Sequence, residues 1–337
     1  MSATLFVTPA DQLAGILPAV ISGGRPRLAD RPTARFLPAL HDVTQDPVWI
    51  VRDDDAPGYE RDGHEVITYP LDWAEQYAGE HWTSHVPYGA GAFLGAFCGR
   101  EHACRVAEQR GCWAVLLLDD NLRRLAFIVQ FRAGVDAAAA GGGLALFADL
   151  LAAVTLSTNG HMTGAHLDAI HQTAFRTDLL ARTGYPYSLY LERTGPGRPP
   201  YCGPTEDDIL HAIAWDQPGT TATTLLVPSL RYMKDHGGRT GMRGHYDSTR
   251  SVGLQRVAPQ ASKLTVMSAH ANGSGGPRVF HRTRPVRTPK VITDRELYDA
   301  ACRKVEQLGA QMYAGHRQYR AAKLRERAAR AAAGSRR

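Results

Sequence analysis

The pattern of hydrophobic and polar positions in the first part of the chain predicts strands and helices in alternation. Short runs rich in β-forming residues lie at 4–8, 47–51 and 65–69, and each ends at Pro or at charged residues. Residues 11–20 and 72–81 favour helices. This alternation is typical of a parallel α/β sheet with right-handed crossovers and helices on its faces.

A helix followed by a buried strand is the best-marked unit of this half. Apolar residues recur at helical spacing in 99–110, and Gly111 supplies a C-terminal stop. Residues 113–118 are all apolar, as expected for a central strand that helices cover on both faces. The predicted strand ends at Asp119 and Asp120.

The second half of the chain has a weaker pattern. Small residues at 134–143 predict a loop, residues 144–154 a helix, and residues 185–191 a strand. Residues 235–276 are rich in Gly, His, Ser and Arg without a sustained period, which predicts loops that face a substrate.

The C-terminal segment predicts a long helix. Thr293 and Glu296 form a capping-box pattern, and apolar residues continue one helical face from Leu297 to Met312. Beyond Gly315 the sequence keeps helix-forming residues but becomes basic and loses its apolar stripe. We therefore expect this part to be a solvent-exposed helix or a frayed extension.

Composition narrows the class of protein. With 337 residues, of which 44% are hydrophobic and 21% charged, the chain suits a globular enzyme with one large α/β domain or two packed halves. No run approaches twenty apolar residues, and the first residues lack the basic region and cleavage pattern of a signal peptide. We expect a cytoplasmic protein without membrane contact.

Cysteine content and charge add two further expectations. The five cysteines are an odd number among apolar neighbours, which suits free thiols, and the spacing of Cys98, Cys104 and Cys112 matches no zinc pattern. The net charge of +6 permits an anionic partner, and much of the excess lies at the C-terminus.

Two acidic clusters directly follow predicted strands, at 53–55 and 119–120. Ligands of parallel α/β sheets bind beyond the carboxyl ends of the strands. Asp119 and Asp120 offer the hard oxygen ligands that Mg²⁺ or Mn²⁺ prefers when it bridges two phosphates. A strand-ending turn would also use aspartate. The long apolar run that leads into these acids is what favours a metal site.

A third acidic cluster, Glu206, Asp207 and Asp208, begins another predicted helix. Thr205 would cap this helix, and acids in the first turn are favoured by the helix dipole, so the cluster has a purely structural interpretation. The catalytic interpretation is that one carboxylate accepts the proton of an attacking hydroxyl.

The stretch GREHACRVAEQRGCWAVLLLDDN at 99–121 resembles the GT-A glycosyltransferase pattern, in which a Gly-Arg helix precedes an apolar strand with a DxD-like ending. More narrowly, GAFLGAFCGREHACRVAEQRGCWAVLLLDDN at 91–121 and GPTEDDILHAIAW at 203–215 are similar to the TET-associated glycosyltransferases of bacteriophages and bacteria. Those proteins glycosylate 5-hydroxymethylpyrimidine bases in DNA after a TET/JBP-type oxygenase has made them. The resemblance covers roughly residues 34–290. Asp119-Asp120-Asn121 departs from a strict Asp-x-Asp.

The resemblance implies a GT-A-like (Rossmann-like), mostly parallel sheet flanked by helices, with a basic helical extension at the C-terminus. Residues 1–290 would form the glycosyltransferase domain, with a nucleotide-sugar-binding half at 1–130 and an acceptor-binding half at 131–290. Residues 291–337 would form the C-terminal helix and basic tail.

The implied reaction moves a sugar from a nucleotide sugar to the hydroxymethyl group of 5-hydroxymethylcytosine, or a related 5-hydroxymethylpyrimidine, in DNA. A UDP-sugar is the favoured donor, Mn²⁺ or Mg²⁺ the expected cofactor, and inversion the favoured outcome. The setting would be the cytoplasm of a bacterial or phage-infected host cell.

The resemblance also implies roles for individual residues. The donor-binding residues would be Thr8, Asp53, Arg100 and Asp119. The metal ligands would come from Asp119, Asp120, Asn121 and His281, with His270 as the competitor of His281. The general base would be Asp207 first and Glu206 second, with Asp208 as the remaining acid of the motif. Structural alternatives exist for the donor residues: Thr8 would end a strand, Asp53 would cap a turn, and Arg100 would pair with Glu101.

Two rival functions stay open. The nearer rival is the same chemistry on a polysaccharide or a small metabolite, and DNA that carries 5-hydroxymethylcytosine discriminates between the two acceptors. The more distant rival is a non-enzymatic nucleic-acid binder that uses the Arg-rich tail. Metal-dependent hydrolysis of a nucleotide sugar would dismiss that second rival.

Overall fold

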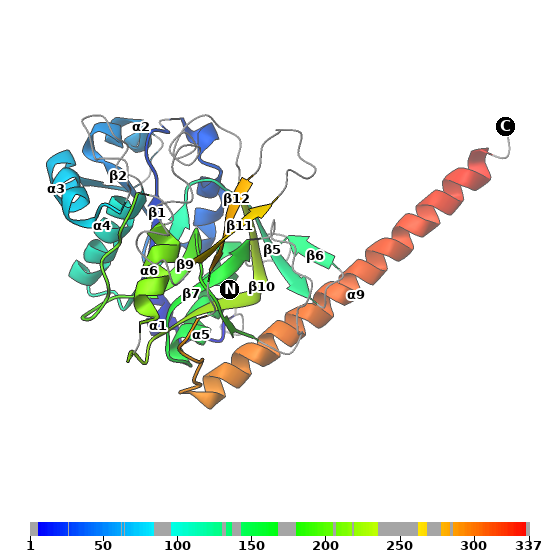
Figure 1. The fold of residues 1–337 in the computed structure, drawn as a ribbon. Helices are drawn as coiled ribbons and strands as arrows, with labels where there is room; N and C mark the ends of the chain where they lie inside the picture. The colour runs from blue at the N-terminus through cyan, green and yellow to red at the C-terminus, as the bar shows by residue number, and fades with distance from the viewer. Residues whose placement is uncertain are drawn as a thin grey trace.

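A ten-stranded sheet forms the centre of the fold, in the order β3-β2-β1-β4-β9-β7-β10-β5-β6 with β8 paired to β10 (Figure 1). This computed structural model describes residues 6–25, 27–61, 63, 65–83, 96–129, 133–136, 143–167, 180–204, 207–217, 219–234, 262–267, 278–283 and 286–334. The strands of the sheet are β1 (Ile16–Ile21), β2 (Val48–Arg52), β3 (Glu65–Tyr69), β4 (Ala114–Asp119), β5 (Leu122–Val129), β6 (Ala133–Asp136), β7 (Gly160–Leu167), β8 (Arg182–Thr183), β9 (Leu189–Arg193) and β10 (Thr223–Lys234). Strands β11 (Ser262–Met267) and β12 (Arg278–Thr283) pair separately.

Most strands of the large sheet run in one direction, as the sequence predicts. β3, β2, β1 and β4 pair in parallel. β9 is antiparallel to both β4 and β7, so β7 and its parallel neighbour β10 again point the same way as β4. β5 and β8 run against β10. The order β3-β2-β1-β4 follows that of doubly wound nucleotide-binding sheets, whose ligands lie beyond the carboxyl ends of the strands.

Helices cover both faces of the sheet and create two hydrophobic cores. One face carries α3 (Leu71–His81), α4 (Ala96–Gln109) and α6 (Asp207–Trp215). The other carries α1 (Ala10–Ala14), the 3₁₀ segment η2 (Pro32–Leu40), α2 (Ala56–Glu60), α5 (Gly143–Leu156) and the start of α9 (Arg295–Gly334). Short 3₁₀ turns η1 (Leu28–Asp30) and η3 (Asp53–Asp55) follow β1 and β2. Successive residues of β4 alternate between the two cores because side chains of a strand point to opposite faces.

The helix before β4 ends where the sequence predicts. Gly111 has a φ of +69°, and the N–H of Cys112 donates to the carbonyl of Ala107 at 2.9 Å, which closes the helix in a Schellman-type turn. The chain enters β4 three residues later. The helix that carries Arg100 therefore leads directly into the strand that ends at Asp119.

The first strand and helix of the sequence prediction are wrong. Residues 6–8 form no strand, α1 ends at Ala14, and residues 16–21 are strand β1 rather than helix. All of β1 is buried, and a short buried apolar run looks the same in a helix and in a strand. Pro18 favours the strand, because Pro inside a helix costs about 3 kcal/mol. β1 tolerates it because pairing with β2 begins only at Ala19.

The other predicted elements are confirmed with smaller shifts. The predictions at 47–51, 65–69, 72–81, 99–110, 113–118 and 144–154 correspond to β2, β3, α3, α4, β4 and α5. The predicted strand at 185–191 begins later, as β9. The loop predictions at 134–143 and 235–276 are wrong where strands β6 and β11 form, and residues 137–142, 235–261 and 268–276 lie outside the described residues.

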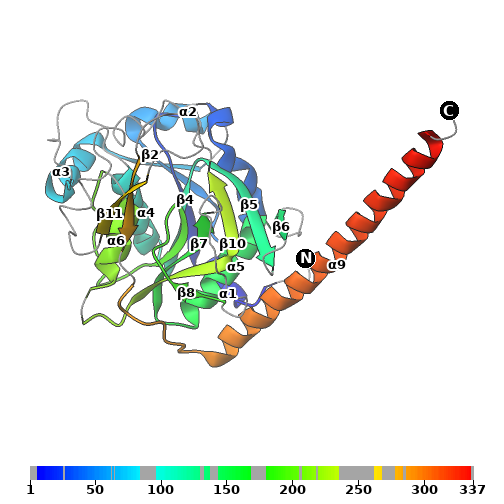
Figure 2. The ribbon, with the colours of Figure 1, turned by 45° about the vertical axis from the view of Figure 1, so that its right-hand side comes forward.

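The C-terminal helix begins on the body of the protein and then leaves it (Figures 1 and 2). Its cap is Asp294 rather than Thr293, since the Asp294 carboxylate accepts the N–H of Leu297 at 3.0 Å. Ala301 is buried in the core beside α5, whereas Leu324 is 65% exposed. Among the described residues, no helix is both long enough and apolar enough to span a membrane.

Candidate active site

The carboxyl ends of β1 and β4 meet at one point on the edge of the sheet. β4 ends at Asp119, which pairs in register with Ile21 of β1, and Asp120 begins the turn into β5. Neighbouring residues at a strand end point to opposite sides, so the two carboxylates contact different elements. Asp119 faces α4 and β10, whereas Asp120 faces the segment that follows β1.

Two cations hold the Asp119 carboxylate. Arg100 Nη2 donates to Oδ1 at 2.8 Å, and Lys234 Nζ donates to Oδ2 at 2.5 Å. Lys234 Nζ also donates to Ser188 Oγ at 2.7 Å, and the Asp119 N–H donates to the Ser188 carbonyl at 2.8 Å. Burial acts to raise the pKa of Asp119, but Lys234 and Arg100 outweigh it and lower that pKa to about 2. Asp119 is therefore a carboxylate at any working pH.

The chain beyond β1 holds Asp120. Its carboxylate accepts hydrogen bonds from Ser22 Oγ and, at 2.5 Å, from Arg25 Nη1. Ser22 Oγ is in turn 2.7 Å from the hydroxyl of Tyr59 in α2. Asp120 is 6% exposed, and burial raises its pKa to about 6 against the opposing effects of Arg25 and Ser22.

Arg100 joins the end of β4 to the start of α6. Its buried guanidinium bonds to Asp119, donates through Nη1 to the Asp207 carboxylate, and lies 3.8 Å from Asp208 Oδ2. Burial alone would lower the pKa of Arg100, but the nearby carboxylates, Asp207 foremost, raise it well above its ordinary value. The positively charged Arg100 therefore bonds to acids from two distant parts of the chain, Asp119 and Asp207.

Asp208 is the acid of this group best suited to accept a proton. Its side chain is 14% exposed, compared with 7% for Asp207, which takes the direct hydrogen bond from Arg100. Burial raises the pKa of Asp208 to about 7, with Arg100 opposing and the charges of Asp207 and Asp119 adding to the rise. A carboxylate with a pKa near neutrality has the basicity that general-base catalysis requires.

The cluster holds four carboxylates and three cationic side chains: Asp119, Asp120, Asp207 and Asp208 with Arg25, Arg100 and Lys234. Its surplus of negative charge and its hard oxygen donors suit a divalent cation. Within the described ranges, however, no three His, Cys, Asp or Glu side chains are grouped as ligands. Asp119 and Asp120 have the oxygen ligands that suit a metal ion, and binding one requires both carboxylates to turn from their present cationic partners.

The structure does not bring Thr8 and Asp53 into this cluster. Thr8 is buried, and its hydroxyl and N–H bond to the carbonyl and carboxylate of Asp149 in α5, at 2.9 and 2.8 Å. Asp53 is exposed, and its carboxylate accepts the N–H of the next residue at 2.9 Å. From the same acidic triplet, Asp55 instead reaches the loop after β1, where it accepts the N–H of Gly24 at 2.9 Å.

The remaining predicted residues lie partly outside the described chain. Asn121 follows Asp120 in the turn into β5. Glu206 and His270 lie outside the described residues. His281 belongs to β12, which the structure describes by its backbone alone.

Sequence reasoning missed four residues of the cluster: Ser22, Arg25, Ser188 and Lys234. Once β1 is placed at residues 16–21, the rule that ligands gather at strand ends points to Ser22 and Arg25. Ser188 and Lys234 belong to no recognisable sequence motif, and only the tertiary structure brings them into contact with Asp119. Ser188 has a φ of +65°, which costs a non-glycine residue on the order of 1–3 kcal/mol and is common at functional sites.

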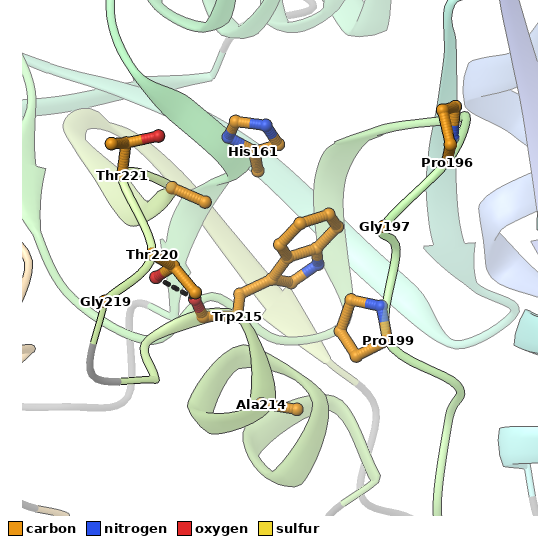
Figure 3. Close-up of a pocket in the computed structure, with 10 residues that line it drawn as sticks. His161, Pro196, Gly197, Pro199, Ala214, Trp215, Gly219, Thr220 and Thr221 are labelled. Carbon is orange, nitrogen blue, oxygen red and sulfur yellow. Dashed lines mark hydrogen bonds between the residues drawn. The ribbon is translucent and has the colours of Figure 1, made fainter.

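A separate pocket of about 370 Å³ lies at the opposite edge of the sheet, where β7 and β10 begin. Figure 3 shows the indole of Trp215, the last residue of α6, at its centre, close to His161 and Pro199. Small residues make up much of the remaining lining. α6 therefore reaches from the acidic cluster at its first turn to this pocket at its last.

No protein-family model matches the chain, and no curated protein matches it significantly by sequence. Among solved structures, it is similar to glucosyl-3-phosphoglycerate synthase from Mycobacterium tuberculosis in complex with Mn²⁺, UDP and glucosyl-3-phosphoglycerate, with a TM-score of 0.44 and 11% identity over 88% of this chain and 98% of that one. The complex of that enzyme with Mg²⁺ and UDP has a TM-score of 0.43 and 12% identity, over 84% and 93%. A mycobacterial protein has a TM-score of 0.45 and 11% identity, over 88% and 93%. With TM-scores this low, the function has to be argued from the site itself.

Proposed function

We propose that this protein is a metal-dependent glycosyltransferase that moves a sugar from a nucleotide sugar to the hydroxymethyl group of a 5-hydroxymethylpyrimidine in DNA. The observation that carries the proposal is the Arg100 guanidinium, which contacts Asp119 at the end of β4 and Asp207 at the start of α6. Sugar transfer needs charges that stabilise a leaving diphosphate and a base for the attacking hydroxyl, both near one anomeric carbon. Asp119 and Asp120 would hold a divalent cation for the diphosphate, and the acids at the start of α6 supply the base.

On the donor side, the two aspartates of β4 are flanked by Lys234 and Arg25. A Mn²⁺ or Mg²⁺ ion held by Asp119 and Asp120 would neutralise charge on the leaving diphosphate. Lys234 and Arg25, which contact those carboxylates, would add positive charge near the diphosphate. The preference for a UDP-sugar comes from the resemblance of residues 99–121.

On the acceptor side, Asp208 acts as the general base. It takes the proton of the acceptor hydroxyl as the hydroxyl oxygen bonds to the anomeric carbon and the bond from that carbon to the diphosphate oxygen breaks. Arg100 holds the neighbouring Asp207 by a hydrogen bond and so fixes the first turn of α6. Direct attack by the acceptor inverts the anomeric configuration.

Two features support a DNA acceptor: the resemblance of residues 91–121 and 203–215 to TET-associated glycosyltransferases, and the charge of the C-terminal segment. Eight Lys and Arg residues and one acid follow Gly315, and the outer part of α9 extends away from the body (Figures 1 and 2). A base inside a duplex must leave the stack before its hydroxymethyl group can reach a buried carboxylate. In this proposal residues 1–130 supply most of the donor contacts and residues 131–290 the acceptor contacts, with Lys234 as the donor contact from the second half.

The direct test incubates the protein with DNA that contains 5-hydroxymethylcytosine or 5-hydroxymethyluracil, Mn²⁺ and a panel of nucleotide sugars. Mass spectrometry of the digested nucleosides should show a new species heavier by one sugar, and a chelator should abolish it. Donor hydrolysis without DNA modification would support a glycosyltransferase whose acceptor is not DNA. Binding of DNA without any turnover of donor would overturn the proposal in favour of a non-enzymatic binder.

A further inference from the structure

Strand β9 carries a polar face toward α6 that the reaction itself does not use. Its apolar residues Leu189 and Leu191 belong to the core on the other side of the sheet, while Ser188, Tyr190 and Glu192 alternate with them. Ser188 contacts the candidate site through Lys234. Glu192, four residues further along, lies deep beneath α6.

Glu192 is fully buried and its carboxylate is completely engaged. Oε1 accepts hydrogen bonds from His211 Nε2 at 2.5 Å and from Trp215 Nε1 at 3.2 Å. Oε2 accepts one from the Tyr201 hydroxyl at 2.5 Å and one from the Cys104 thiol at 3.9 Å. The Tyr201 ring also stacks on the His211 imidazole, with centroids 3.6 Å apart. Burial acts to raise the pKa of Glu192, but His211 and its other partners bring it below its ordinary value, so the group is an anion.

The hydrogen bonds of Glu192 to His211 and Trp215 bind it to α6, the helix that also carries Asp207 and Asp208. Asp207, His211 and Trp215 are spaced by four residues in α6, so they lie along one face of the helix. Glu192 therefore holds the second and third turns of α6, and the first turn places Asp207 against Arg100. The helix has only nine residues, so a tilt at one end moves the other.

The energetics argue against a role in stability alone. A buried charge is costly to desolvate, and replacing a buried pair with apolar residues of similar volume is often neutral or stabilising. An apolar contact between β9 and α6 would hold the two elements together equally well. What a hydrogen-bonded pair adds is a defined rotation and height of the helix, because its geometry is directional.

We propose that Glu192 and His211 are positioning residues, which lock α6 on β9 at the rotation and height that aim Asp207 at Arg100 and Asp208 at the acceptor. This inference rests on the proposed function of Asp208. The effect is transmitted through a rigid helix, so neither residue needs to touch the substrate.

The chain contains a control in a second buried pair, which joins a carboxylate to a guanidinium. Glu101 of α4 and Arg198 make two hydrogen bonds of 2.9 Å, and their side chains are 5% and 7% exposed. This pair is on the same face of the sheet. The other side-chain hydrogen bonds and ion pairs of this pair, within the described part of the chain, go to Arg105, Glu108, Pro199 and the backbone N–H of Tyr201, whose hydroxyl bonds to Glu192. None of these partners belongs to α6. Removing the pair therefore tests for the general cost of losing a buried pair.

The experiment compares wild type with Glu192→Met/His211→Phe and with Glu101→Met/Arg198→Met. We measure Tm, donor affinity, kcat, and hydrogen exchange of the amides at the start of α6. The first double variant should lose about tenfold to a hundredfold in kcat, the scale of an ångström-sized misplacement, with donor affinity within about twofold. Its α6 amides should exchange faster. The control should keep the wild-type kcat and α6 exchange rate.

A single substitution keeps the test decisive if a double variant does not fold. His211→Gln keeps an N–H donor for Glu192 and should retain most of kcat, whereas Trp215→Phe removes one donor and should lose kcat in proportion to faster α6 exchange. Wild-type kcat in a folded Glu192→Met/His211→Phe protein, or in folded Trp215→Phe with altered α6 exchange, would overturn the inference. Failure of the proposed function is separate, because wild type itself would then show no donor turnover.

Discussion

The charged residues at the carboxyl end of β4 and those beyond Gly315 are similar in number. The two sets differ in burial, in pairing and in net charge. In the β4 cluster, seven charged groups are largely buried and each is paired within hydrogen-bond or ion-pair distance. The chain beyond Gly315, which includes the outer part of α9, carries eight cations against one acid and leaves the body. Residues 1–315 hold 31 Lys and Arg against 32 Asp and Glu, so this outer segment supplies the whole net positive charge.

The difference in burial determines over what distance, and on which partner, each set of charges acts. Buried charges interact at low effective dielectric, shift one another's pKa values and are barely screened by salt. Exposed charges act over about 10 Å at moderate salt and contribute to association with a polyanion. Variants of the cluster should therefore change kcat, whereas variants of the outer segment should change the affinity for DNA.

The largest expected effect comes from the acids of β4. Asp119→Asn keeps the size of the side chain but removes the charge that faces Arg100 and Lys234. We expect kcat to fall by at least about a hundredfold, the scale of losing one preorganised electrostatic group. Asp120→Asn should have a similar effect, and both would be measured as sugar transfer at saturating donor.

Far-ultraviolet circular dichroism and thermal unfolding serve as controls for these two variants. Normal turnover by both, with wild type indifferent to a chelator, would contradict a metal site at the end of β4.

The next effect distinguishes the two acids of α6. Asp208→Asn should lower kcat by about a hundred- to ten-thousand-fold, because general-base catalysis is worth that much, with little change in donor affinity. Asp207→Asn should lower kcat less and weaken stability more, since it removes the partner of the buried Arg100. A larger loss of kcat in Asp207→Asn would return the role of base to Asp207.

The pH dependence of kcat sharpens this comparison. The pKa of Asp208 is raised to about 7 by burial, so the proton occupies the base below neutrality. The rate should rise about tenfold per pH unit up to about pH 7 and level off above it.

The contribution of Asp208 to the free energy of unfolding should fall as pH rises. The folded pKa lies above the unfolded one, so the contribution of Asp208 is full below about pH 4 and is lost as pH rises through 7. Asp208→Asn should flatten both profiles, as followed by initial rates and Tm between pH 5 and 8.

The smallest expected effect on turnover comes from deleting residues after Gly315. The apparent KM for DNA should rise and its salt dependence should flatten, by roughly 0.9 in the log–log slope for each phosphate that the shortened chain no longer neutralises. The value of kcat at saturating DNA should stay within about twofold, because the cluster is untouched. Equal DNA affinity and salt slope in the full and shortened chains would exclude a role for this segment in DNA binding.

Much of the fold could be predicted from local pattern. The acids of β4 stand out because a fully apolar strand runs directly into them, and the helix that carries Arg100 ends at a glycine with the required positive φ. The alternation Ser-Leu-Tyr-Leu-Glu at 188–192 also carried a signal, since a strand with one apolar and one polar face between two covered layers implies buried hydrogen bonds.

The sequence by itself determined strands β2, β3 and β4, helices α3, α4 and α5, the acids at strand ends and the uneven charge of the C-terminal segment, because these depend on neighbouring residues. Only the tertiary structure decided that residues 16–21 form a central strand, that Lys234 and Ser188 meet Asp119, and that the pKa of Asp208 is raised toward neutrality. Strand pairing joins residues more than a hundred positions apart, and burial sets the dielectric around each carboxylate. Neither quantity is a property of a local stretch of chain.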